Sequence, residues 1–480
     1  MEPCHAGSVS DQAGIRIAST EGRWVLAAAT LGSGMALLDS TVVNVALRRI
    51  GEDLDAGLSD LQWISNGYLL SLASLILLGG SLGDRYGRRK IFVIGVIGFA
   101  VASLACGIAP TAPVLIAARV LQGVAAALLT PGSLAMIQGA FVHDDRARAI
   151  GTWSGLGSVA TAIGPFLGGW LVQYASWRGV FLINLPIAAV TLFAARHVPE
   201  TRDTQSVAGF DVAGAVLGSL GLAGITYALI EWTTLPQVAL VAGIVGVAAG
   251  VGFVVQERRS PHPMMPPRLF GSRQFSAANA MTLLTYAALG AVMFFLVLQL
   301  QVVSGFDALT AGLATMPVTV MMIFLAGRGG ALAAHIGPRL PMTVGPLLCA
   351  VGTLLLSRVG AGVNYWVEVA LPLVVFGLGL ATLVAPLTAT VLAAAPDHNA
   401  GIASGINNAI ARAGSLLAVA ALPLLVGLSG DDYQNPAAFG AGYRAAMLWC
   451  AGLLAAGGVL SFLTIRNPEG VRRATRQVRS

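Results

Sequence analysis

The chain has 480 residues, of which 56% are hydrophobic and only 10% are charged. A soluble globular protein carries about 25% charged residues, so this composition excludes an ordinary soluble domain. The formal net charge of +6 is small for this length. In a membrane protein such an excess reports the orientation in the bilayer rather than nucleic-acid binding.

Apolar runs long enough to cross a bilayer recur along the whole chain. A run of about eighteen or more apolar residues predicts a membrane-spanning helix, because only a helix satisfies its own backbone hydrogen bonds within lipid. We therefore expect an all-α polytopic membrane protein with 14 transmembrane helices. They are predicted near residues 24–46, 61–82, 91–109, 113–138, 149–173, 178–195, 211–231, 237–256, 275–301, 308–327, 340–357, 366–394, 400–428 and 443–465.

The cations predict which side of the membrane each loop faces. An even number of spans places both termini on one side. With the termini inside, the cytoplasmic segments hold 21 of the 28 Lys and Arg residues, and the outer loops hold five. Cytoplasmic loops are enriched in Lys and Arg. We therefore predict a multi-pass protein of the cell (plasma or inner) membrane with both termini in the cytoplasm.

One polar cluster interrupts the apolar sequence and recurs in weaker form. "GGSLGDRYGRR" (79–89) aligns with "GGALAAHIGPR" (329–339) at an offset of 250 residues. Asp84 meets Ala334 in this alignment, so the second copy lacks the acid. Repeated halves are a common construction of secondary transporters.

Two charged residues lie inside predicted spans. Asp39 is placed about 10 Å from the outer end of the first span, and Arg119 about 9 Å deep in the fourth, at 1.5 Å per residue. Ionisable residues inside spans mark ion or substrate paths. Burial favours a protonated Asp39 and a nearby cation favours an ionised one, which suits a proton carrier. The alternative is a structural ion pair between helices. We expect the two side chains to approach each other in one conformation.

Four motifs in order resemble the major facilitator superfamily, in its fourteen-helix drug:proton antiporter branch. The first is the cluster at 79–90, which resembles the loop between helices two and three. The others are "LLDSTVVNVAL" (37–47), "LIAARVLQGVAAA" (115–127) and "GPFLGG" (164–169). The resemblance implies two six-helix bundles, an inserted helix pair, and alternating access to a central cavity. It also implies proton coupling through Asp39 and Arg119.

This resemblance divides the chain into five parts. They are a cytoplasmic tail (1–23), an N-terminal bundle (24–195), the inserted pair with its flanking loops (196–274), a C-terminal bundle (275–465) and a basic tail (466–480). The proline-rich segment 256–274 is the clearest linker, because proline opposes helix continuation.

The same resemblance assigns further residues. A cytoplasmic gate is expected at Gly80, Asp84, Arg85, Gly87, Arg88 and Arg89, although the cations alone would also serve as a topology anchor. An antiporter motif is expected at Gly164, Pro165, Gly168 and Gly169, as a pivot or as a close-packing surface. Apart from the resemblance, possible polar residues of the cavity are Asn44, Asn407, Asn408 and Arg412, although Asn407 and Asn408 are expected rather to bond between helices. The family often has an Arg–Gln pair one position before Arg412, which this chain lacks.

The expected function is a proton-coupled antiporter that exports small amphipathic compounds or drugs across the plasma membrane. An apolar cavity with one acid would suit lipophilic cations. The alternatives are export of an endogenous metabolite or lipid, and a non-transporting membrane sensor on the same scaffold. We expect no enzyme activity, cofactor, metal or nucleic-acid partner, because no nucleophile–base set or metal cluster is evident. The expected partners are protons, a small-molecule substrate and the lipid bilayer.

Overall fold

The computed structural model describes residues 14–202, 211–396 and 399–467. Residues 1–13 of the predicted N-terminal tail and 468–480 of the predicted basic tail lie outside this range. Within the described residues the secondary structure is helical, apart from an isolated bridge between Ile15 and Phe141. The prediction of an all-α protein is confirmed for the described residues.

The first half of the chain contains α1 (Thr20–Leu54), α2 (Leu58–Tyr86), α3 (Arg88–Gly107), α4 (Ala112–Ala140), α5 (His143–Tyr174), α6 (Gly179–Leu182) and α7 (Asn184–Ala195). Next come α8 (Val212–Glu231), α9 (Pro236–Arg259) and the 3-10 helix η1 (Pro267–Gly271). The second half contains α10 (Arg273–Val302), α11 (Ala308–Ala314), α12 (Met316–Ile336), α13 (Arg339–Leu356), the π-helix η2 (Tyr365–Ala370), α14 (Leu371–Ala393), α15 (Ala400–Leu425), the 3-10 helix η4 (Asp432–Gln434) and α16 (Pro436–Thr464).

Thirteen helices of the described residues are long and apolar enough to cross a membrane, with α11–α12 and η2–α14 each counted as one. The sequence predicted 14. The difference lies at 178–195, where α6 and α7 form a shorter apolar stretch, Gly179–Ala195. Pro186 has no N–H to donate to the carbonyl four residues earlier. The missing bond coincides with the break between α6 and α7 at Ile183.

Helix α1 is longer than its apolar run. The prediction ended the span at residue 46, whereas the helix continues to Leu54. Arg48 and Arg49 both contact Glu52, at 3.0 and 3.1 Å. Such pairs one turn apart stabilise a helix, so the charged extension stays helical where hydropathy alone predicts a loop.

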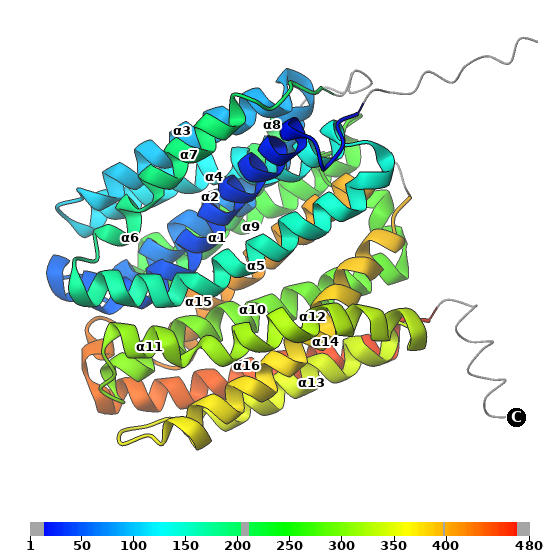
Figure 1. The fold of residues 1–480 in the computed structure, drawn as a ribbon. Helices are drawn as coiled ribbons and strands as arrows, with labels where there is room; N and C mark the ends of the chain where they lie inside the picture. The colour runs from blue at the N-terminus through cyan, green and yellow to red at the C-terminus, as the bar shows by residue number, and fades with distance from the viewer. Residues whose placement is uncertain (1–13, 203–210, 397–398, 468–480) are drawn as a thin grey trace, which may run out of the picture.

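The helices lie side by side, and most contacts are made within each half of the chain. Helix α4 packs on α2 and α3, and α1 packs on α5 and α7. In the second half α10 packs on α15 and α16, and α14 packs on α12 and α13. Figure 1 shows α1 and α2 in blue above α13 and α16 in yellow and red. Helix α8 packs on α9 and also touches α2 and α15.

The two halves are joined by hydrogen bonds at one end of the molecule, which we call the Ala56 end. Its loops are 55–57, 175–178, 303–307 and 426–435, at the left of Figure 1. Leu58 N–H donates to the Gly430 carbonyl at 2.9 Å, and the Tyr433 hydroxyl donates to Ala56 O at 2.8 Å. At this end Gln301 Nε2 donates to Val45 O at 3.1 Å. This end is therefore closed between the halves.

The opposite end carries the turns around Gly87 and Gly337, and we call it the Gly87 end. Gly87 is the single residue between α2 and α3, and Gly337 follows α12 directly. Both have a positive φ, 113° and 84°, which glycine adopts without steric cost. Each half thus reverses direction at this end over one or two residues.

Candidate functional site

A buried ion pair lies inside the first half. Arg119 Nη1 of α4 is 2.5 Å from Asp39 Oδ2 of α1. The Asp39 side chain is fully buried, and 2% of the Arg119 side chain is exposed. A buried charge is stable only when it is paired and hydrogen-bonded. The two charges that the sequence placed in separate apolar helices thus meet in this conformation.

Two neutral amides complete the hydrogen bonding of Asp39, and a serine accepts a bond from each of them. Gln122 Nε2 donates to Asp39 Oδ1 at 2.8 Å, and Asn184 Nδ2 donates to the same oxygen at 3.0 Å. Both amides also donate to Ser103 Oγ, at 2.8 and 3.3 Å. All three of these residues are fully buried. The carboxylate therefore accepts bonds from α4 and α7 as well as from its ion-pair partner.

Arg119 is held by contacts beyond the carboxylate. Its Nη1 donates to Gln122 Oε1 at 2.6 Å, and its Nε donates to Ile64 O of α2 at 2.9 Å. The guanidinium carbon lies 4.4 Å from the centroid of the Tyr68 ring and 5.8 Å from that of Phe181. Cations are attracted to aromatic faces at such distances. The network therefore joins α1, α2, α3, α4, α6 and α7.

The network is sealed from solvent in this conformation, since Asp39, Gln122 and Asn184 are fully buried. Ionised Asp39 fits the donors around it. A proton on Asp39 would remove the countercharge of Arg119 and one acceptor of the amides.

Asp39 lies farther from the end of α1 than from the expected end of the apolar span. Asp39 is fifteen residues before Leu54, which corresponds to about 22 Å at 1.5 Å per residue. The predicted depth of about 10 Å was counted from residue 46, the expected end of the apolar span, whereas the helix itself continues to Leu54. Arg119 lies seven residues after the start of α4, about 10 Å along that helix.

The predicted gate residues form the compact turn at Gly87. Arg88 Nη2 is 2.8 Å from Asp84 Oδ1, one helical turn earlier. Arg88 Nη1 also donates to Ala135 O of α4, at 3.3 Å. Arg88 therefore connects the turn to α4 through its bond to Ala135 O, while its ion pair with Asp84 joins the two sides of the turn. Gly80 packs near Pro131, and Arg85 is exposed.

Glu200 completes this turn, and the sequence analysis did not identify it. Its carboxylate accepts bonds from the backbone N–H groups of Arg89 at 3.0 Å and Lys90 at 3.1 Å. A carboxylate at the start of a helix satisfies free N–H groups and the helix dipole. Glu200 follows α7, so the exit of the first half is anchored to its own turn.

The second copy of the cluster has the same construction with a neutral anchor. Asn467 follows α16, and its Oδ1 accepts a bond from Arg339 N–H at 3.1 Å. Its Nδ2 donates to Ile336 O at 3.2 Å. Arg339 corresponds to Arg89 in the alignment at an offset of 250. The alignment of the two clusters is therefore matched by the structure of their turns, although no acid stands at Ala334.

The "GPFLGG" motif packs α5 closely against both halves. A methyl group at Gly168 would lie 2.9 Å from Val42 Cγ1 of α1, and one at Gly164 would collide with Thr41. On the other side, a methyl group at Gly169 would lie 2.6 Å from Leu309 Cα of α11. Helix α5 is continuous through Pro165. The motif thus lies at a junction between the halves and lacks space for larger residues.

The four possible cavity residues have different surroundings. Asn44 is partly buried on α1. Asn407 Nδ2 donates to Asn279 Oδ1 and Thr282 Oγ1 of α10, at 3.1 and 2.7 Å, so it bonds between helices. Asn408 is exposed and donates only to Ser404 O, at 3.2 Å. Arg412 is partly buried, and its Nε has no hydrogen-bond partner.

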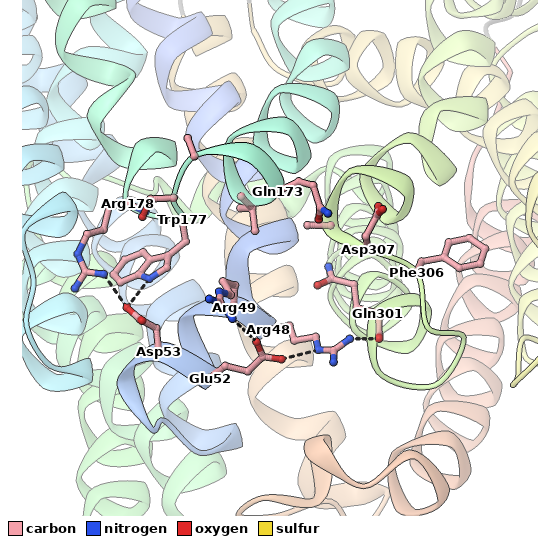
Figure 2. Close-up of a pocket in the computed structure, with 14 residues that line it drawn as sticks. Arg48, Arg49, Glu52, Asp53, Gln173, Trp177, Arg178, Gln301, Phe306 and Asp307 are labelled. Atoms are coloured by element: carbon pink, nitrogen blue, oxygen red, sulfur yellow. Dashed lines mark hydrogen bonds and ion pairs between the residues drawn. The ribbon is translucent and has the colours of Figure 1, made fainter.

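A charged cavity of about 460 Å³ lies at the Ala56 end, between the ends of α1, α5 and α10. Figure 2 shows Arg48 reaching from Glu52 to the carbonyl of Gln301, which belongs to the other half. Nearby, Asp53 Oδ2 accepts bonds from Trp177 Nε1 at 2.9 Å and Arg178 Nη1 at 2.8 Å. The cavity is therefore lined by residues that link α1 to its neighbours at the closed end.

Within the described ranges, no group of three or more His, Cys, Asp or Glu side chains converges as metal ligands would.

Comparisons with known proteins agree on one family. The model of the Major Facilitator Superfamily matches residues 29–419. The tetracenomycin C resistance and export protein of Streptomyces glaucescens is 36% identical over 84% of this chain and 75% of its own. The methylenomycin A resistance protein of Bacillus subtilis (strain 168) is 35% identical over 94% of this chain and 96% of its own.

Solved structures show the same fold. The crystal structure of a bacterial homologue of the human lysosomal transporter Spinster, inward-facing and unoccupied, matches with a TM-score of 0.68 and 16% identity. The match covers 93% of this chain and 97% of that one. The fold of the present chain is thus that of a membrane transporter.

Proposed function

Because the chain belongs to the major facilitator superfamily, we propose that it exports small amphipathic compounds across the cell membrane in exchange for protons. Two relatives are a resistance and export protein and a resistance protein, which supports the direction of transport. The observation that carries the proton-coupled part is the sealed pair of Asp39 and Arg119. Ionisable residues within membrane-spanning helices are costly, and they mark ion or substrate paths.

The halves move as two bundles in this proposal. The N-terminal bundle is 24–195, with α6 and α7 together as its sixth span, and the C-terminal bundle is 275–465. The segment 196–274 contributes the inserted helices α8 and α9, which gives the count of 14. The preference of contacts for their own half supports this division.

The Ala56 end faces outward, and both termini are cytoplasmic. The excess of cations at the Gly87 end supports this orientation. The hydrogen bonds between the halves at the Ala56 end then form a closed outer gate, and the conformation is inward-facing. Opening this gate would break the bonds of Arg48 and Tyr433 to the other half.

Proton exchange at Asp39 drives the change between conformations. Protonation from outside would release Arg119 from its countercharge, and the network would rearrange. Deprotonation toward the cytoplasm would restore the pair seen here. Asp84 and Arg88 hold the turn of the inner gate, and the small residues around Pro165 let α5 move against α1 and α11.

Proton flux in reconstituted vesicles tests this function. Full-length protein is placed in vesicles with an imposed pH gradient, and tetracenomycin C and methylenomycin A are used as probes. We expect either compound to accelerate dissipation of the gradient in wild type. Asp39→Asn should lower coupled transport by at least about 100-fold, since Asn has no proton to exchange at neutral pH.

A matched variant controls for folding and reconstitution. Asp307 caps α11, where its side chain accepts a bond from Thr310 N–H at 2.7 Å. Asn caps helices about as well as Asp, so Asp307→Asn should transport like wild type. Full coupled transport by Asp39→Asn would refute the proposal. Binding without any flux in wild type would instead favour a non-transporting sensor.

A further inference from the structure

We infer that Arg412 recognises an anionic group of the exported compound, so the substrates are amphipathic acids rather than lipophilic cations. The inference rests on the proposed export function and names its substrate class. The acidic group is a carboxylate or an ionised phenol on an apolar body. The first observation is that Arg412 lacks any partner of opposite charge within the described chain.

Arg412 makes no hydrogen bond or ion pair with any residue of the described ranges. Its Nε is buried without a partner, and the rest of the side chain is partly exposed. The titratable side chains near it are two tyrosines, Tyr68 and Tyr286, and a tyrosine is neutral at physiological pH. Guanidinium is always protonated, and an unpaired charge at membrane depth costs several kcal/mol. A group from outside the chain is therefore needed to balance it.

Arg412 lies midway along α15, where that helix crosses α2 of the other half. Toward the Ala56 end, Gln62 Nε2 donates to Val419 O at 2.7 Å. Toward the Gly87 end, a methyl group at Gly405 would lie 2.7 Å from Leu77 Cδ2. Arg412 is seven residues from each of these contacts. The unpaired cation thus sits on the seam between the halves, where alternating access places the substrate.

Two tethers to α10 fix this part of α15. Asn407 bonds to Asn279 and Thr282, and Ser415 Oγ donates to Tyr286 O at 2.8 Å. The guanidinium is therefore held on a rigid helix rather than on a loop. The Tyr286 hydroxyl has no hydrogen-bond partner among the described residues and can serve as a second donor to an anion.

The buried acid of α1 already has its partners among the described residues. Asp39 is fully buried and accepts bonds from Arg119, Gln122 and Asn184. A cationic substrate would have to displace these donors, whereas an anionic one meets an unsatisfied guanidinium. The expectation of lipophilic cations, which relied on Asp39 as a substrate contact, is therefore not favoured.

Tyr68 connects the substrate position to the proton position. Its ring stacks on Arg119 at 4.4 Å, and its hydroxyl donates to Ala36 O of α1 at 3.4 Å. It is also one of the two tyrosines near Arg412. The same side chain therefore contacts Arg119 and neighbours the proposed anion position.

Binding of three matched probes tests the inference. Purified full-length protein in nanodiscs is titrated with pyrenebutyrate, its methyl ester and the pyrenebutyl trimethylammonium ion, with empty nanodiscs as background. These probes share one apolar body and differ in charge. We expect wild type to bind pyrenebutyrate at least about tenfold more tightly than either analogue, as a charge-assisted hydrogen bond predicts.

Substitutions of Arg412 test whether this side chain causes the preference for the anionic probe. Arg412→Gln should lose about 10- to 100-fold in affinity for pyrenebutyrate and change less than about threefold for the ester. Arg412→Lys keeps the charge without the planar fork and should retain an intermediate preference, which guards against a folding defect in the first variant. Arg358→Gln removes an exposed arginine and should bind like wild type.

Each outcome decides the matter. The inference is overturned if Arg412→Gln prefers pyrenebutyrate as strongly as wild type does. It is also overturned if wild type prefers the ammonium ion or the ester, or if it binds none of the three probes. If wild type shows substrate-driven proton flux in vesicles and Arg412→Gln keeps the preference for pyrenebutyrate, the export function is supported and anion recognition by Arg412 is refuted. A preference lost in Arg412→Gln without any flux would preserve anion recognition and refute export.

Discussion

Each half of the molecule places an arginine within a membrane-spanning helix, and the surroundings of the two arginines differ. Arg119 in the first half is enclosed by Asp39, Gln122 and the Ile64 carbonyl. Arg412 in the second half has aromatic neighbours and no acid. The charge of Arg119 is balanced within the chain by Asp39. The charge of Arg412 has no such partner within the described residues, and we infer that an anionic ligand balances it.

The same asymmetry appears at the Gly87 end. The turn at Gly87 is anchored by the carboxylate of Glu200 and carries the ion pair of Asp84 and Arg88. The turn at Gly337 is anchored by the neutral amide of Asn467. The repeated backbone is thus kept in both halves, while the acids that pair with its cations are concentrated in the first.

Breaking the buried pair should have the largest effect on stability. We expect Arg119→Gln to cost about 3–5 kcal/mol, because it leaves the charge of Asp39 buried and unpaired. The double variant Asp39→Asn with Arg119→Gln should be more stable than Arg119→Gln alone. Thermal unfolding of the four proteins in one detergent measures this cycle. Strictly additive costs would show that the two charges do not interact.

Removing a neutral partner of Asp39 should have an intermediate effect. Asn184→Leu removes a hydrogen bond to a charged group and should cost about 1.5–3 kcal/mol. Asn66 is a matched control, since it is equally buried and both its amide atoms lack partners in the described chain. Asn66→Leu should be neutral or stabilising. Equal losses in the two variants would contradict the network.

The anchors of the two turns should give the smallest and most selective effect. Glu200→Ala and Asn467→Ala each remove a side chain that caps a helix, at about 1 kcal/mol. Only the loss at Glu200 should shrink as salt is added, because only that side chain is charged. Unfolding midpoints at low and high salt test this difference, and an equal salt response in both variants would disprove it.

The fold was predictable where apolar length alone decides it. The apolar runs placed most spans within several residues. The end of α1 was missed because Arg48, Arg49 and Glu52 lower hydropathy while their mutual pairing maintains the helix. The break at Ile183 depends on one missing backbone bond at Pro186, which a count of apolar residues does not register.

The ion pair was predictable, whereas its surroundings were not. Asp39 and Arg119 stand out because a lone charge in an apolar helix needs a partner. Gln122, Ser103 and Asn184 are ordinary polar residues in such helices, and sequence does not reveal which way each helix is rotated. Glu200 follows a helix in a polar segment, where acidic residues are common, so the sequence alone does not single it out.

Infrared spectroscopy of the Asp39 carboxyl group tests the central claim most directly. The carbonyl band of a protonated acid is followed with pH in wild type, Asp39→Asn and Arg119→Gln. We predict a titrating band that is missing in Asp39→Asn, displaced in pH by Arg119→Gln, and displaced again when an exported compound saturates the protein. The same band in Asp39→Asn, or a wild-type titration unaffected by the compound, would contradict proton coupling at this residue.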